Sequence, residues 1–156
     1  MLLDEEIRKF LTGTVSIGIA SRNAELVPSV ARAKGCTVTV GASQKVRVLI
    51  SAAHAGQLLD DVRSSGMISA TFSVPNTHRT MQLKGSDARM TELQPGDRDL
   101  MDAYVVAFAE AIGPLGFSRE MVQAYFASPP DEVAIEFTPS DAFQQTPGPS
   151  AGARLP

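Results

Sequence analysis

The densest cluster of polar side chains in the sequence is the run THRTMQLKG, residues 77–85. It holds the imidazole of His78 and the guanidinium of Arg79, followed by the hydroxyl of Thr80 and the amide of Gln82. A guanidinium fits carboxylate or phosphate oxygens as a forked donor, and hydroxyl and amide groups donate and accept hydrogen bonds. The run is therefore a candidate site for an anionic or heteroaromatic ligand. It fits equally well as the polar edge of a sheet or as a subunit contact.

Two pairs of basic residues lie near the ends of expected strands. Arg32 and Lys34 follow one apolar run, while Lys45 and Arg47 open another. Either pair could help to hold a single phosphate group, because Arg and Lys are common partners of phosphate oxygens. Charges beside a turn are more often simply solvated, so both interpretations stand at this point.

The sequence lacks the motifs of the common catalytic centres. It has no GxSxG, HExxH or CxxC, no GxxxxGK[ST], and no GxGxxG after a strand. Cys36 is the one cysteine and lies in an apolar strand pattern, which predicts a buried structural side chain. The two histidines, His54 and His78, are too far apart for a recognisable metal motif. We therefore predict no catalytic residue and no metal site.

Composition narrows the class of protein. The 156 residues are 44% hydrophobic and 20% charged, as expected for one globular domain. The net charge of -3 argues against a nucleic-acid partner, and no apolar run approaches the ~20 residues of a membrane span. The acidic start and the single cysteine favour a cytoplasmic protein. With aromatic residues at 6% and no tryptophan, dimerisation would help to stabilise the core.

The apolar periodicity changes several times along the chain. Alternation predicts seven strands, over residues 15–19, 26–33, 36–40, 46–50, 67–74, 80–90 and 133–137. Helical spacing predicts four helices, over residues 4–11, 58–65, 97–112 and 118–126. Asp97 and Ser118 are expected to cap the last two helices, and Gly66 to end the second. Because no helix separates the first four strands, a small antiparallel barrel is favoured over a doubly wound sheet.

This order of elements, with the run SATFSVPNTHRTMQLKG, resembles the pyridoxamine 5'-phosphate oxidase-like family of FMN-binding split barrels. The run VAIEFTPSDAFQQTPGPSAG also resembles the closing strand and tail of a subgroup of that family. The resemblance covers nearly the whole chain and implies a mainly β fold, an antiparallel split β-barrel of about six to seven strands with peripheral helices. Residues 1–143 would form this single domain, with a helical insertion at about 97–126 and a Pro/Gly-rich tail over 144–156.

The resemblance also implies a homodimer that binds FMN in a cleft shared by both subunits. The expected function is that of a flavin-dependent oxidoreductase acting on an unidentified small substrate. By position, Arg32 falls near the family's phosphate-side arginine and Ser51 falls at a strand-end hydroxyl. Thr80 occupies the place of a glutamine five residues before Gly85. Four further FMN-binding candidates rest on chemistry rather than on the motif: Lys34, His78, Arg79 and Gln82.

The sequence departs from the family after the fourth strand. The founding oxidases have an Arg-Lys pair there that grips the phosphate, whereas this chain has the uncharged run AGQL, residues 55–58. Each charge-assisted hydrogen bond lost is worth about 1.5–3 kcal/mol. The oxidases' C-terminal Trp and Arg pair is also missing, which argues against oxidation of pyridoxamine phosphate itself. The alternative is a non-enzymatic cofactor-binding or dimeric interaction module that has lost tight FMN binding and holds a deazaflavin or heme.

Overall fold

The computed structural model describes residues 3–39 and 41–156. The strands are β1 (Ser16–Arg22), β2 (Pro28–Arg32), β3 (Gly35–Val38), β4 (Val46–Ser51), β5 (Ile68–Ser73), β6 (Thr80–Gly85), β7 (Arg89–Thr91), β8 (Glu132–Phe137) and β9 (Asp141–Gln144). The helices are α1 (Glu5–Leu11), α2 (Ala52–Ala55), α3 (Leu58–Ser65), α4 (Asp97–Ile112) and α5 (Arg119–Phe126), with a 3-10 turn η1 (Gly113–Leu115). No helix in these described ranges has the length and apolar character needed to cross a bilayer.

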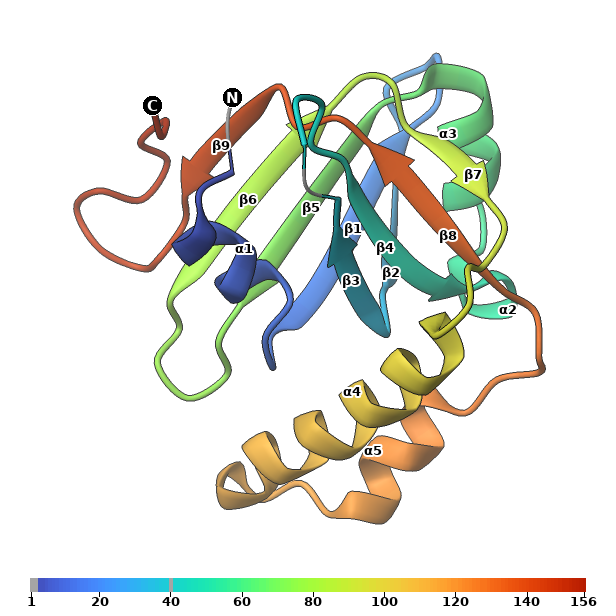
Figure 1. The fold of residues 1–156 in the computed structure, drawn as a ribbon, viewed down its shortest axis with the longest axis vertical. Helices are drawn as coiled ribbons and strands as arrows, with labels where there is room; N and C mark the ends of the chain where they lie inside the picture. Colours follow the sequence, from blue (N-terminus) through green and yellow to red (C-terminus); the bar gives the residue numbers. More distant parts are fainter. Residues whose placement is uncertain (1–2, 40) are drawn as a thin grey trace.

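Two antiparallel sheets face each other to form the barrel (Figure 1). Within the described residues, one sheet has the order β2-β1-β5-β6-β9 and the other the order β3-β4-β8-β7. In β1 the buried side chains of Ile17 and Ile19 alternate with half-buried ones, because only one face of this strand meets the core. The mainly β, antiparallel fold expected from the sequence is confirmed.

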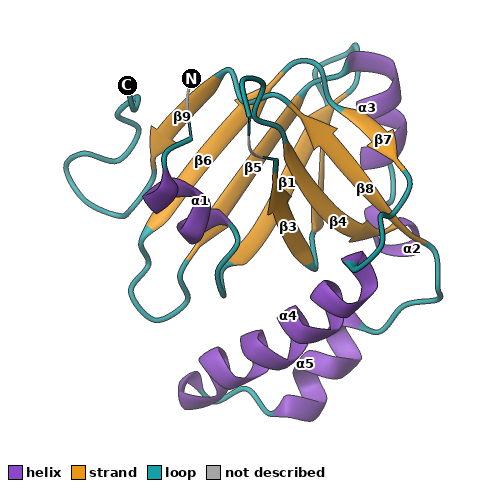
Figure 2. Ribbon diagram, viewed as in Figure 1, coloured by secondary structure: helices purple, strands orange, loops and turns teal. Residues whose placement is uncertain are grey.

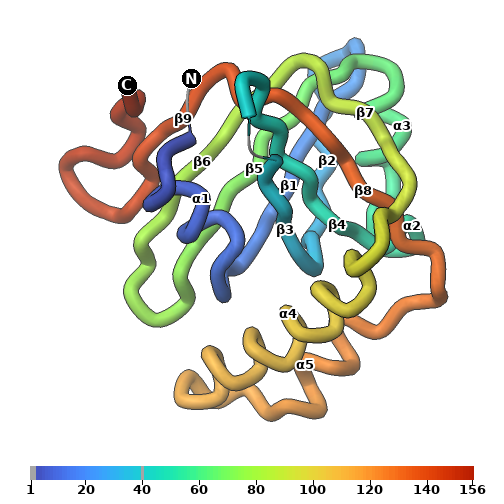
Figure 3. Tube along the Cα trace, viewed as in Figure 1, coloured from blue at the N-terminus to red at the C-terminus, as the bar shows by residue number. Residues whose placement is uncertain are grey.

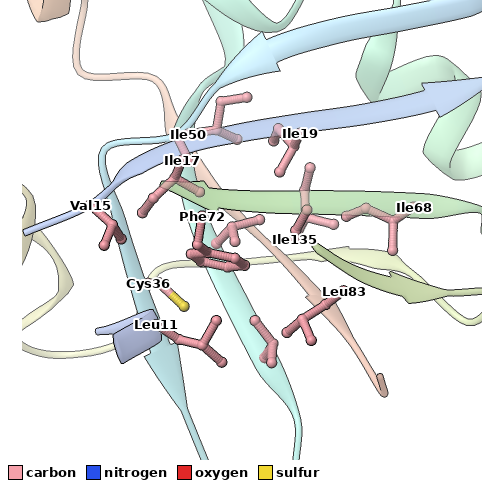
Figure 4. Packing of buried hydrophobic residues seen from close by; sticks show 14 of the residues in the cluster. Leu11, Val15, Ile17, Ile19, Cys36, Ile50, Ile68, Phe72, Leu83 and Ile135 are labelled. Atoms are coloured by element: carbon pink, nitrogen blue, oxygen red, sulfur yellow. The ribbon is translucent and has the colours of Figure 1, made fainter. Parts of the chain in front are cut away.

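The core fills the space between the two sheets. Figure 4 shows Ile17, Ile19 and Phe72 from one sheet close to Ile50 and Ile135 from the other. Each of these five side chains is at most 1% exposed. Every side chain of β4 is buried. On the outer face, Leu49 lies in a second apolar cluster with Met101 and Ala134. The barrel is therefore held by aliphatic packing, as the aromatic-poor composition predicts.

The chain crosses from one sheet to the other between β2 and β3. The amide of Ala33 donates to the carbonyl of Ile17 in β1 at 3.0 Å, whereas the amide of Lys34 donates to the carbonyl of Leu49 in β4 at 2.7 Å. Arg32 is the last residue of β2 and therefore lies at this junction. The crossing therefore places Arg32 on the sheet of β1 and β2, and ties Lys34 to the sheet of β3 and β4.

Helices α4 and α5 pack against each other at one end of the barrel (Figure 2). The ring centroids of Tyr104 and Phe108 lie 5.6 Å apart, and Phe126 packs edge-on against both. Ser118 caps α5 as predicted, by accepting a hydrogen bond from the amide of Met121. The prediction that Asp97 caps α4 is wrong. Gly96 is the N-cap residue of α4. The Asp97 carboxylate instead forms an ion pair with the buried Arg47 of β4.

Several strand predictions need correction. The strand predicted over 80–90 is two strands, β6 and β7, in different sheets. It breaks at Gly85, where a Cβ would lie 2.8 Å from the Phe137 ring and 3.0 Å from the Thr138 carbonyl oxygen. The strand predicted over 26–33 begins only at Pro28, because the Asn23 side chain accepts from the Val27 amide and closes the hairpin turn. Residue 40, the end of another predicted strand, lies outside the described residues.

Three described elements were not predicted, namely the short helix α2, the 3-10 turn η1 and the last strand β9. The predicted tail over 144–156 begins inside β9 and returns along it (Figure 3). Phe143 forms a β-bridge with Arg154, and the Leu155 amide donates to the Ala142 carbonyl at 2.8 Å. The tail therefore folds back on the outer strand of the larger sheet.

Candidate functional site

A cleft of about 690 Å³ opens on the larger sheet, and we call it the main cleft. Its floor is made of side chains from β1, β5 and β6 that alternate with core residues. The floor residues are Gly18, Ala20, Ser69, Thr71 and Gln82. Gly18, Ala20 and Ser69 are small, so few atoms project from this part of the floor. Ser69, Thr71 and Gln82 carry hydroxyl or amide groups that can form hydrogen bonds.

Arg32 lines the main cleft at the junction of the two sheets. Its Nε and Nη2 atoms are buried and make no hydrogen bond among the described residues. The guanidinium also lies near the Tyr104 hydroxyl, where its charge partly offsets the burial that raises the pKa of Tyr104 to about 12. The guanidinium carbon lies 5.8 Å from the ring centroid of Phe108 and 6.0 Å from that of Tyr125. A guanidinium presents N–H groups in a rigid fork that matches the two oxygens of a carboxylate or phosphate. Buried charge without a partner is costly, so this edge of Arg32 is a candidate anion receptor.

Lys34 also lines the cleft, but its charge is already paired. Its ammonium lies 3.2 Å from Oε1 of Glu132 and 2.9 Å from Oγ of Ser128. Burial alone would raise the pKa of Glu132, but hydrogen bonds from its own backbone, Lys34 and Arg98 outweigh it and hold the pKa below its ordinary value. This internal pairing leaves Lys34 little capacity for an external anion.

Ser51, at the end of β4, is committed in the same way. Its Oγ donates to Oδ1 of Asp131 at 3.0 Å, and the amide of Ala53 donates to Oδ2 at 2.6 Å. A carboxylate therefore already occupies the start of α2, where the family resemblance implies a phosphate. His54, in α2, is exposed and lines the cleft beside Ser51.

The polar run of residues 77–85 does not act as one cluster. Gln82 alone reaches the floor of the main cleft, where its Nε2 donates to Oγ of Ser69 at 2.9 Å. Thr80 hydrogen-bonds with Ser73 across the hairpin at 2.6 Å. Arg79 turns toward α1, where it pairs with Glu6 at 2.9 Å. The polar groups of the run 77–85 therefore make contacts in three separate places: the floor of the main cleft, the β5–β6 hairpin and α1.

His78 lies in the hairpin between β5 and β6 with φ of 59°, a left-handed conformation that is rare outside glycine. It lines a second pocket of about 510 Å³, which Arg32 also lines. Four of the seven candidates thus surround the main cleft, namely Arg32, Lys34, Ser51 and Gln82. The other three, His78, Arg79 and Thr80, are not among its lining residues.

Sequence reasoning missed several residues of this region. Ser69 and Thr71 could have been found, because hydroxyl side chains alternate with apolar ones along β5 and must share the outer face. Tyr125 and Asp131 carry no comparable signal, since Tyr125 reaches the cleft from α5 and Asp131 contacts the cleft residue Ser51 from the loop before β8. Tertiary packing alone brings them there.

Nucleophilic and metal chemistry find no support around the barrel. Burial raises the pKa of the Cys36 thiol to about 12, so it stays protonated and unreactive at neutral pH. Within the described ranges, no group of three or more His, Cys, Asp or Glu side chains could hold a metal ion.

No family model matches the sequence, and no curated protein matches it. Solved structures do match. HupZ of Group A Streptococcus gives a TM-score of 0.57 at 13% identity, over 97% of this chain and 100% of that one. A putative pyridoxamine 5'-phosphate oxidase from Lactobacillus delbrueckii gives 0.53 at 15% identity, over 90% and 93% of the two chains. The chain has the split-barrel fold of the pyridoxamine 5'-phosphate oxidase-like proteins.

Another split barrel similar to this chain is HutZ, the heme storage protein of Vibrio cholerae. It gives a TM-score of 0.50 at 16% identity, over 92% of this chain and 95% of HutZ. At such identities the similarity establishes the split-barrel fold.

Proposed function

We propose that this split barrel binds FMN in the main cleft and works as a homodimeric flavin-dependent oxidoreductase on a small substrate. The observation that carries the proposal is that Arg32, whose buried Nε and Nη2 atoms have no hydrogen-bond partner among the described residues, lines a cleft with small and polar side chains on its floor. A planar heteroaromatic ring with one anionic group is the ligand that such a cleft accommodates. Its volume of about 690 Å³ lies in the usual range for ligand pockets.

The floor fits the ring. A Cβ added at Gly18 would meet no atom within 4 Å, so glycine leaves open space directly above β1. Ala20 and Ser69 are also small, and an aromatic ring can therefore lie close to the sheet. Thr71 and Gln82 supply hydroxyl and amide groups for the polar edge of the ring.

Of the candidate residues Arg32, Lys34 and Ser51, we expect Arg32 to hold the phosphate of FMN. Lys34 is paired with Glu132, and Ser51 donates to Asp131, so neither is free to hold a phosphate. We therefore assign the phosphate to the Nε–Nη2 edge of Arg32. With one charged partner, the expected affinity is lower than that of a site with several charge-assisted hydrogen bonds.

Bound FMN would supply the redox chemistry. The residues of this chain would bind and orient it: the β1 floor supports the ring, Arg32 anchors the phosphate, and Tyr125 shields the guanidinium from water. No acid–base residue of the chain is assigned a role in the reaction.

A second copy of the chain would complete the cleft. Leu26, Val27 and Val30 form an apolar strip along the β1–β2 hairpin and are 68%, 56% and 75% exposed. Val30 also lines the main cleft. Exposed apolar side chains at the rim of a binding cleft favour burial against another subunit. Sedimentation at micromolar concentration tests this, and a mass near 16.6 kDa would contradict it.

Titration with FMN tests the cofactor directly. We expect shifted flavin absorption bands and quenched flavin fluorescence, with one FMN bound per chain. Arg32→Ala should weaken binding by about tenfold or more, as expected for the loss of a charge-assisted pair. Riboflavin, which lacks the phosphate, should bind wild-type and variant protein equally. An unchanged spectrum in excess FMN would rule the proposal out.

One observation favours a second candidate, a non-enzymatic barrel that holds heme. His54 is exposed and lines the same cleft, and neutral imidazole is a common axial ligand of heme iron. The similar fold of the heme storage protein HutZ supports this candidate. Hemin titration separates the two functions, because a heme absorption shift that His54→Ala abolishes would favour heme over FMN.

A further inference from the structure

The second pocket, of about 510 Å³, lies between the helical pair and the barrel, and we call it the helical pocket. The chain has only seven phenylalanines and two tyrosines. Four of these line this one pocket: Phe108, Phe117, Tyr125 and Phe126. Ile112, Leu115, Met121 and Val122 complete its apolar wall. The helical insertion thus gathers the scarce aromatic side chains around one cavity.

Much of this apolar wall faces solvent. Leu115 is 52% exposed, Phe117 48%, Met121 57% and Tyr125 60%. Large apolar side chains rarely cluster in water unless they contact a ligand or partner, because burying them is favourable by about 25 cal/mol per Å². The helical pocket therefore has the surface of a binding site.

The polar end of the pocket carries a positive charge. Arg32 lines the helical pocket as well as the main cleft, and Ser16, Ser73 and His78 are the other polar residues that line it. No Asp or Glu is among the described residues that line the helical pocket. An apolar cavity that ends in an unpartnered guanidinium is complementary to a molecule with an apolar body and one acid group.

We propose that the helical pocket binds an amphipathic organic anion, whose apolar body lies among the aromatic side chains and whose acid group pairs with the Nε–Nη2 edge of Arg32. This goes beyond the proposed FMN site, because the walls of the helical pocket come from α4, η1 and α5. One edge of a guanidinium can donate its hydrogen bonds to only one acid group at a time. The anion and the FMN phosphate therefore compete for Arg32, and such a ligand would lower the affinity for FMN.

A small organic anion fits better than a second copy of the chain. A second copy would have to bring an acidic side chain to Arg32, whose Nε and Nη2 atoms are buried. Arg32 lines the pocket, so a small anion inside it can pair with the guanidinium once the side chain turns its buried edge toward the pocket. The two occupants differ in how their binding depends on protein concentration.

The test uses 8-anilinonaphthalene-1-sulfonate, an aromatic anion whose emission rises in apolar surroundings. We expect one molecule to bind per chain, and Arg32→Gln to weaken binding by about tenfold or more. Decanoate should displace the dye at lower concentration than decanol, because only decanoate carries the acid group. Equal binding to wild type and Arg32→Gln would overturn the proposal, as would no binding to the wild type.

A matched pair of variants on α5 locates the dye. Met121 is exposed and lines the helical pocket, whereas Gln123 is exposed on the same helix and lines another depression. Met121→Glu should weaken dye binding at least several-fold, because it removes apolar contact and repels an anion. Gln123→Glu adds the same charge and should change little. Circular dichroism verifies that both variants keep the fold. Equal effects of the two variants would contradict the proposed location.

The two binding proposals can fail separately. Gly18→Val fills the floor of the main cleft and should weaken FMN without affecting the dye, whereas Met121→Glu should do the reverse. FMN should displace the dye, and riboflavin should not. If the dye behaves as described but FMN does not bind, the helical pocket stands and the proposed function fails. A second copy in the pocket would exclude the dye at protein concentrations where the chain is dimeric. If the dye binds only at dilutions where sedimentation shows monomer, the proposal is overturned.

Discussion

Arg47 and Asp97 form a buried ion pair, with Nη2 of Arg47 2.9 Å from Oδ2 of Asp97. The arginine is 1% exposed and the aspartate 4%. The same arginine donates to the Glu92 carbonyl at 3.2 Å, and the Gln94 amide donates to Asp97 at 2.7 Å. The pair therefore fastens β4 to the first turn of α4. Through it, the barrel fixes where the helical pair begins.

Loss of this pair should destabilise the protein strongly. Asp97→Ala leaves the buried Arg47 charge without its partner, so we expect the free energy of unfolding to fall by about 3–5 kcal/mol in urea denaturation. Asp60→Ala is the control, because the exposed Asp60–Arg63 pair should be worth less than about 1 kcal/mol. Similar losses in both variants would show that the buried pair has no special role.

Acid sensitivity should depend on Glu136. A hydrogen bond from Arg89 at 2.8 Å, together with Lys45 at 3.2 Å, outweighs burial and holds the pKa of Glu136 below its ordinary value of 4.5. A carboxyl with a lowered pKa in the folded state adds stability above its unfolded pKa and loses it as the pH falls through the folded one.

Glu136→Gln should therefore lower stability near pH 7 and flatten its decline below about pH 4.5. Denaturation curves measured from pH 7 to pH 3 check this. The exposed Glu120→Gln serves as the control and should keep the wild-type slope. Parallel curves for Glu136→Gln and wild type would contradict the expectation.

Removal of the Arg32 charge should stabilise the ligand-free protein. Its Nε and Nη2 atoms are buried without a partner, so Arg32→Met replaces an unsatisfied charge by an apolar side chain of similar length. We expect a gain of about 1 kcal/mol in the free energy of unfolding, a common trade between stability and binding. The same substitution at the exposed Arg63 should not raise the free energy of unfolding. A loss of stability in Arg32→Met would mean that the guanidinium is satisfied without a ligand.

Cys36 should resist alkylation in the folded protein. It is 3% exposed, and burial raises its pKa to about 12. Iodoacetamide at pH 8 should leave the native thiol unmodified while labelling it fully in urea, as measured by mass spectrometry. Rapid labelling of the native protein would show that the strand around Cys36 opens readily.

Local patterns predicted individual strands well but not their distribution between the sheets. The alternation of Ile17 and Ile19 depends on nearest neighbours along β1 and is visible in the sequence. The pairing of β1 with β5, and the passage of β6 into β7, depend on contacts between distant segments. Gly85 must be glycine because Phe137 and Thr138 approach it, and only the folded chain brings them close.

The same distinction holds for the candidate site. The family resemblance located Arg32 and Ser51, and the structure places both in the main cleft. Their chemical state could not be foreseen, because the partner of Ser51 is Asp131, which lies 80 residues later in the chain. Likewise Lys34 meets Glu132 across 98 residues. The sequence shows which groups are present, whereas tertiary contacts decide which of them are left for a ligand.

The stacking of aromatic side chains beside Arg32 gives the molecule an optical property. The chain has no tryptophan, so its ultraviolet emission comes from two tyrosines. Tyr125 lies 6.0 Å from the guanidinium carbon of Arg32, and Tyr104 packs against Phe108, which the same guanidinium approaches. Both tyrosines therefore lie around one charged group, and we expect an anion that binds there to change the emission of the unlabelled protein.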